Sequence, residues 1–191
     1  MQKITTVFLA IAALVLFGCD SKPKSEQSGS AAEYDGKTLP KLLSQADIDA
    51  VIKNNKEIGA NFQKFGKENP ETANLNFNQN PNAKQPKINE IDVKQIIKAV
   101  RTGPSTAKYN ELLRQSGMKS SEPLLAYLVL LQNYAFLQIP KFEKFLGMMP
   151  KDQQANMQAV IKMQKDINAI THKDDFELVK KNESIFLKAF Q

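Results

Sequence analysis

The sequence predicts an all-α fold, a compact bundle of about five to seven helices around a buried central helix. Six segments carry apolar residues at helical spacing, namely 48–65, 93–100, 109–113, 124–139, 157–170 and 176–190. No segment of useful length alternates apolar and polar residues, which is the pattern of a half-buried strand. Residues that typically begin or end helices flank most of these segments.

The first helix is expected over residues 48–65. Ser44 or Asp47 can cap its start, and Gly66 with Pro70 closes it. Its apolar face consists of Ile48, Val51, Ile52, Ile58, Phe62 and Phe65. Helical periodicity then vanishes over residues 69–89, where three prolines and seven asparagines predict a long loop.

Two shorter helices follow this loop. The first places Val93, Ile96, Ile97 and Val100 on one side and is expected to end at Gly103-Pro104. The second carries Tyr109, Leu112 and Leu113 and is expected to stop at Gly117.

Residues 124–139 predict the central helix. Ser120-Ser121-Glu122-Pro123 is a strong start signal, because proline fits the first turn of a helix. The helix is apolar nearly all round, which indicates burial in the middle of the domain. The run is short for a membrane span, Gln132 and Asn133 interrupt it, and Pro140 is expected to end it.

Beyond Pro140 we expect a short segment at 142–146 and two further helices. The first faces inward with Met157, Val160, Ile161, Ile167 and Ile170. Asp174–Glu177 resembles a capping box for the last helix. That helix is lined by Phe176, Val179, Ile185, Phe186 and Phe190.

The N-terminus has the layout of a secretory signal peptide. Lys3 precedes an uncharged run from Ile4 to Phe17, and a small residue, Gly18, follows it. The run of about 14 residues is shorter than the ~20 that a transmembrane helix needs. We therefore expect residues 1–18 to be a removable export signal.

The only cysteine of the chain stands directly after this signal. Leu16-Phe17-Gly18-Cys19 resembles the lipobox of bacterial lipoproteins, with Phe17 departing from the usual residue at its position. The resemblance implies cleavage before Cys19 and attachment of acyl chains such as palmitate to this residue. It also implies a place in the cell envelope facing the periplasm, and Asp20 suggests the inner membrane, with the outer membrane as the alternative.

The organisation that follows has three parts. Residues 1–18 form the signal peptide, and residues 19–37 form a lipidated tether whose Ser, Gly, Lys and Glu content predicts flexibility. Residues 38–191 form a single all-α domain with a long Asn/Pro-rich loop at 69–89. Because no second cysteine exists, this domain cannot contain a disulfide and must depend on its core.

The charge of the chain disfavours a nucleic-acid partner. The formal net charge is +6, but only Arg101 and Arg114 among the 26 basic side chains are arginines. Nucleic-acid and phosphate sites favour the planar fork of arginine. A lysine-rich exterior is better suited to a membrane surface with anionic lipid.

No motif for catalysis, metal or cofactor binding rises above chance. His172 is the only histidine, and with Asp174, Asp175 and Glu177 it supplies too few strong ligands for zinc, so we expect no metal and no cofactor. Paired carboxylates could still hydrolyse glycans. The candidates for such a pair are Glu57, Glu90, Glu111 and Glu143.

Two surface features are candidate binding sites. Lys94, Lys98 and Arg101 form a basic stripe beside the apolar face of their helix, suited to an anionic partner, although a solvated helix face has the same pattern. Phe77 stands among asparagines in the long loop and could anchor a partner. Met148, Met149, Met157 and Met163 could line an adaptable groove or fill the core.

We therefore expect a lipid-anchored periplasmic domain that binds an envelope protein without catalysis. It could be an adaptor, an assembly factor or an immunity protein that neutralises a toxin. Because this domain is basic, such a toxin would be acidic or bind through apolar contacts. The alternatives are a peptidoglycan hydrolase or lyase with paired carboxylates, and a carrier of lipid or another apolar ligand. A carrier would need a cavity among Leu128, Leu131, Phe136, Met157 and Ile161.

Overall fold

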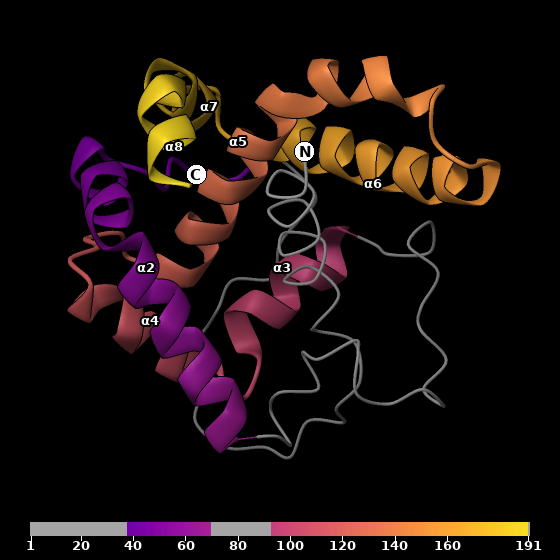
Figure 1. Cartoon of the computed structure of the whole chain (residues 1–191). Coiled ribbons are helices and arrows are strands. Elements are labelled where there is room, and N and C mark those ends of the chain that lie inside the picture. The colour runs from indigo at the N-terminus through magenta and orange to yellow at the C-terminus, as the bar shows by residue number, and fades with distance from the viewer. Residues whose placement is uncertain (1–37, 70–92, 191) are drawn as a thin grey trace.

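A computed structural model describes residues 38–69 and 93–190 of the chain (Figure 1). These residues form seven helices and no strand, so the predicted all-α fold class is confirmed. The helices are α2 (Gln45–Glu68), α3 (Val93–Thr102), α4 (Thr106–Gln115), α5 (Pro123–Leu146), α6 (Lys151–Ile170), α7 (Lys173–Lys181) and α8 (Glu183–Ala189).

Helix α5 is the central helix of the bundle, as predicted. Every residue from Pro123 to Ala135 is buried, and α3, α4, α6, α7 and α8 all pack against this helix. By length and composition alone, Pro123–Lys144 could cross a membrane. However, 83% of the most apolar 18-residue stretch of this helix is buried inside the domain, as in the core helix of a globular protein.

The predicted end of the central helix at Pro140 is wrong. Helix α5 continues through Pro140 to Leu146 and includes the segment that we expected to be separate. Proline removes one backbone hydrogen bond and crowds the preceding turn, which bends a helix more readily than it stops one when both halves are packed. The C-terminal part of α5 accordingly turns away from the first part and runs alongside α6 (Figure 1).

The predicted last helix is two helices, α7 and α8, separated at Asn182. This residue has φ −98° and ψ 6°, and its backbone N–H donates to Val179 O. Its side-chain amide donates to Leu178 O and to Gln45 Oε1 of α2. These side-chain bonds compete with regular helical pairing. The break at Asn182 therefore also ties the C-terminal helices to α2.

The first turn of α2 is fixed by a capping box and by a buried carboxylate. Ser44 is the N-cap, as predicted, and its hydroxyl accepts from the backbone N–H of Asp47. Asp47 is 1% exposed and accepts from the backbone N–H groups of Ser44, Lys119 and Ser120 at 2.9, 2.6 and 3.0 Å. One carboxylate thus joins the start of α2 to the loop that precedes α5.

A second buried carboxylate holds the segment that enters the domain. Asp175, in the first turn of α7, is fully buried and accepts from the backbone N–H groups of Leu42 and Leu43 at 2.9 and 3.0 Å. Nearby, the Leu39 N–H donates to Ile170 O at 2.7 Å. Residues 39–43 are therefore secured to the C-terminal helices by three hydrogen bonds.

The turn after α4 requires glycine. Gly117 has φ +95°, a conformation that side chains with a Cβ rarely adopt. It lets Met118, 2% exposed, enter the core directly after the helix ends. The predicted stop at Gly117 is confirmed, since α4 ends at Gln115.

We expect the two buried aspartates to make opposite contributions to the pH dependence of the free energy of unfolding. Burial opposes ionisation of Asp47, but its hydrogen bonds from Ser44, Lys119 and Ser120 outweigh burial and hold its pKa below 3.8. Burial raises the pKa of Asp175 above 3.8, despite the N–H groups of Leu42 and Leu43. Asp47 therefore stabilises the folded state at neutral pH, and this contribution is lost as the pH falls below about 3.8. Asp175 acts in the opposite sense, because its contribution to stability declines as the pH rises above about 3.8.

We expect Asp47→Asn to lower the free energy of unfolding at neutral pH by about 1–3 kcal/mol, because the backbone N–H groups of Ser44, Lys119 and Ser120 lose a charged acceptor. The free energy of unfolding of this variant should also fall less on acidification than that of the native chain. Asp175→Asn should instead make stability rise more steeply with pH. Urea unfolding between about pH 3 and pH 7 measures both slopes. Equal changes of slope in the two variants would contradict these assignments.

Candidate functional site: the basic face of α3

Helix α3 is held against the bundle by two neighbouring isoleucines. Ile97 belongs to the main core, whereas Ile96 packs with Met163 and Ile167 of α6 in a second apolar cluster. Lys94 and Lys98 lie one turn apart and are both exposed. The packing of α3 therefore fixes which side of the helix faces solvent, and we call Lys94 and Lys98 the basic face of α3.

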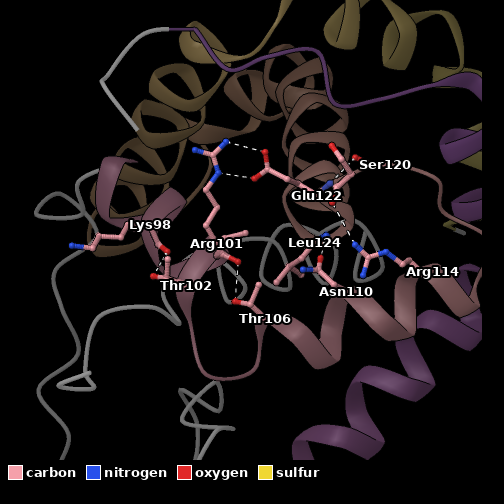
Figure 2. Close-up of polar contacts among 11 residues, drawn as sticks. Lys98, Arg101, Thr102, Thr106, Asn110, Arg114, Ser120, Glu122 and Leu124 are labelled. Carbon is pink, nitrogen blue, oxygen red and sulfur yellow. Dashed lines mark hydrogen bonds and ion pairs between the residues drawn. The ribbon is translucent and has the colours of Figure 1, made fainter. Parts of the chain in front are cut away.

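Arg101, the third residue of the predicted stripe, is engaged inside the domain. Its Nε and Nη2 atoms donate to Glu122 Oε2 and Oε1 at 2.6 and 3.0 Å (Figure 2). The side chains are only 15% and 33% exposed. A two-bond guanidinium–carboxylate pair of this kind is stronger and more directional than a surface ion pair. Lys98 points away from this pair (Figure 2), so the predicted stripe divides into a structural arginine and two surface lysines.

Polar contacts around this ion pair also fix the turns next to α3. Thr102 and Thr106 hydroxyls donate to Lys98 O and Val100 O at 2.8 and 2.9 Å. A Cβ on Gly103 would lie 2.5 Å from Ala99 O, so glycine is needed where α3 ends. These contacts hold the C-terminal end of α3 in one position.

The start of α5 is satisfied by side chains from the preceding elements. Asn110 Oδ1 of α4 accepts from the Leu124 N–H at 2.8 Å, and Ser120 Oγ accepts from the Glu122 N–H at 3.3 Å. Helix N-termini leave N–H groups without helical partners, and these two side chains supply acceptors (Figure 2). Glu122 is thereby held where Arg101 reaches it.

The other proposed binding residues, Cys19 and Phe77, lie outside the described residues. The same holds for Glu90 and for most of the Asn/Pro-rich loop. The methionines separate: Met163 is buried, Met149 and Met157 are partly buried, and Met148 is 82% exposed. They do not share one environment.

The carboxylates considered for catalysis lie on the surface. Glu111 forms an ion pair with Lys108 at 2.9 Å, and Glu143 pairs with Lys165 at 3.2 Å. Glu57 is exposed on α2. These three glutamates come from α2, α4 and α5 rather than from one element.

His172 and its acidic neighbours organise the start of α7. His172 is the N-cap, and its Nδ1 accepts from the Asp174 N–H at 3.2 Å. The expected cap at Asp174 is therefore wrong by two residues; Asp174 instead forms an ion pair with Lys41 at 3.8 Å. Within residues 38–69 and 93–190, no group of three His, Cys, Asp or Glu side chains could hold a metal ion.

The interior contains amide side chains that the sequence analysis did not identify as a group. Asn168 Nδ2 of α6 donates to Asn133 Oδ1 of α5 at 3.1 Å. Gln132 and Gln164 are 3% and 1% exposed, and neither amide group has a hydrogen-bond partner. Leaving a buried polar group unpaired costs about 1–3 kcal/mol. The interruption of the apolar run at Gln132 and Asn133 was visible in the sequence, but the burial of Gln164 was not.

The residues proposed to line a carrier cavity fall into two groups. Leu128, Leu131 and Ile161 are buried, whereas Phe136 and Met157 are partly buried. Phe136 packs edge-to-face on Phe176 of α7, with ring centroids 5.8 Å apart. At least Phe136 therefore serves to join α5 to α7.

Comparison with known proteins gives no further assignment, since no family model, curated protein or solved structure matches the chain. Inference about function therefore depends on the chain itself.

The ion pair between Arg101 and Glu122 should couple more strongly than an ordinary surface pair. We expect a double-mutant cycle with Arg101→Ala and Glu122→Ala to give a coupling energy of about 1–2 kcal/mol in unfolding experiments. The matched control is the exposed pair of Lys108 and Glu111, where about 0.5 kcal/mol or less is expected. Equal coupling in both pairs would show that Arg101 is not a structural residue.

Proposed function

We propose that the chain is a bacterial envelope lipoprotein that binds a protein partner and has no catalytic role. An acyl group on Cys19 anchors it, and the helical domain faces the periplasm, at the inner membrane if Asp20 acts as a retention signal. The observation that carries the binding proposal is the exposed basic face of α3 on a helix held by the core. An adaptor, an assembly factor and an immunity protein that neutralises a toxin all fit this arrangement.

The rigidity of α3 supports a role in binding. Ile96 and Ile97 fix its buried side, and the Arg101–Glu122 pair fixes its C-terminal end. Lysines presented on a fixed helix lose less conformational freedom on binding than lysines on a mobile segment. Two cations one turn apart favour a partner surface that carries carboxylates.

The positions of the candidate chemical groups also favour binding over glycan hydrolysis. Glu111 and Glu143 are each paired with a lysine, and both buried aspartates accept backbone hydrogen bonds. A hydrolase with paired carboxylates needs two acids about 5–10 Å apart on either side of a substrate. The acids of α4, α5 and α7 described above have structural contacts instead.

Charge reversal on the basic face should weaken binding without unfolding the domain. We expect Lys98→Glu to reduce recovery of the partner from envelope membranes by about tenfold, because a partner carboxylate would then face a like charge. The matched control is Lys53→Glu on α2, which makes the same charge change at another exposed helical lysine.

Quantitative affinity capture after chemical cross-linking measures this difference. If Lys98→Glu and Lys53→Glu retain the partner equally, the basic face of α3 is not the contact. If the native chain recovers no partner in stoichiometric amount, the binding function itself is wrong.

A further inference from the structure

The end of α5 and the start of α6 form a hairpin that extends beyond the core. We call residues 140–159 the hairpin arm. None of its described side chains is buried: burial ends at Ile139 on α5 and resumes at Val160 on α6. Figure 1 shows the two segments running side by side away from the other helices, with their connection at the far end.

The tip of the arm, residues 146–151, presents apolar side chains on an ordered turn. The Met149 N–H donates to Leu146 O at 3.1 Å, and the Gln154 side chain donates to Met149 O at 2.7 Å. Met148 is 82% exposed, while Leu146 and Met149 are partly exposed. Among the described residues, the exposed large apolar side chains are those of Met148 and, at 47%, Ile185.

Two lysines flank this apolar tip. Lys144 and Lys151 are both exposed, and neither forms an ion pair with another described residue. Apolar side chains between cations are typical of surfaces that enter the boundary between lipid headgroups and acyl chains. The long stems of lysines let their charged ends stay at the anionic headgroups.

The dimensions of the chain allow this tip and the proposed lipid anchor to reach one bilayer. The 20-residue helix α6 is about 30 Å long. The Leu39 N–H donates to Ile170 O, at the end of α6 that lies farthest from the tip. Residues 20–37 connect Cys19 to the domain and can span up to about 60 Å when extended. This reach argument rests on the proposed lipid anchor, whereas the chemistry of the tip does not.

We propose that the tip of the hairpin arm inserts shallowly into an anionic bilayer and gives the domain a second, non-covalent membrane contact. Met148 enters the acyl boundary, and Lys144 with Lys151 contacts the anionic headgroups. The arm thereby restrains the orientation of the domain above the membrane, which a single N-terminal anchor does not do.

The test places a fluorescent reporter at the tip. In the full chain, Cys19→Ala removes the only native thiol, so Met148→Cys can be labelled uniquely with an environment-sensitive dye. The matched control is Ile185→Cys, the other exposed apolar position. Vesicles contain either phosphatidylcholine alone or phosphatidylcholine with phosphatidylglycerol. Any contribution from the N-terminal segment is common to both labelled chains.

We expect the label at position 148 to shift to shorter wavelength on anionic vesicles and to be quenched several-fold more by quenchers within the bilayer than the label at 185. Adding Lys144→Glu and Lys151→Glu should abolish this difference while circular dichroism stays unchanged. Because Cys19 is absent, the outcome is independent of lipidation and of partner capture through Lys98.

Three results would overturn the proposal. The first is an emission spectrum of the label at 148 that does not change on anionic vesicles. The second is equal quenching of the labels at 148 and 185. Shielding of position 148 by added envelope proteins but not by lipid would assign the tip to a protein contact instead.

Discussion

Burial of helix α5 is the constraint on which the rest of the structure depends. Its first half is apolar on nearly every side, so no single neighbour could cover it. Helices α3, α4, α6, α7 and α8 each cover part of it. Helix α2 contacts α4 and α8 and is tied to the loop before α5 through Asp47. The bundle is therefore organised from its middle outward, and its surface features are consequences of how each outer helix is oriented by the core.

The same core explains the contrast between the basic face of α3 and the hairpin arm. Helix α3 is short and fully supported, since its isoleucines contact two apolar clusters and Arg101 binds Glu122. The α5–α6 hairpin is longer than the core that it covers, so residues 140–159 extend past the last buried positions. Near the centre, the same two helices contribute the buried amides of Gln132, Asn133 and Gln164. A buried amide without a hydrogen-bond partner lowers stability relative to an apolar side chain.

Local signals in the sequence were sufficient for most of the fold. Apolar spacing located the helices, Ser44 marked the start of α2, and Gly117 marked the end of α4. The errors at Pro140 and at Asn182 arise where distant contacts override local preference. Helix α5 continues past Pro140 because α6 packs alongside it, and Asn182 breaks the last helix with side-chain bonds to Leu178 and to Gln45 of α2.

The candidate sites were less predictable than the fold. The spacing of Lys94, Lys98 and Arg101 placed them together, but the packing of α3 against α5 brings Arg101 to Glu122. The exposure of Met148 was equally hidden, because apolar periodicity does not reveal how far neighbouring helices extend. The Arg101–Glu122 ion pair and the exposure of Met148 both depend on how the helices pack. Local sequence patterns do not reveal that packing.

The proposed function depends on a covalent lipid anchor at Cys19. Mass spectrometry of the N-terminal peptide from the protein recovered in bacterial membranes tests that claim most directly. We expect a peptide that begins at Cys19 and carries diacylglyceryl, with or without a further acyl group on its amine. A peptide that begins at Met1, or one cleaved elsewhere with an unmodified Cys19 thiol, would contradict it.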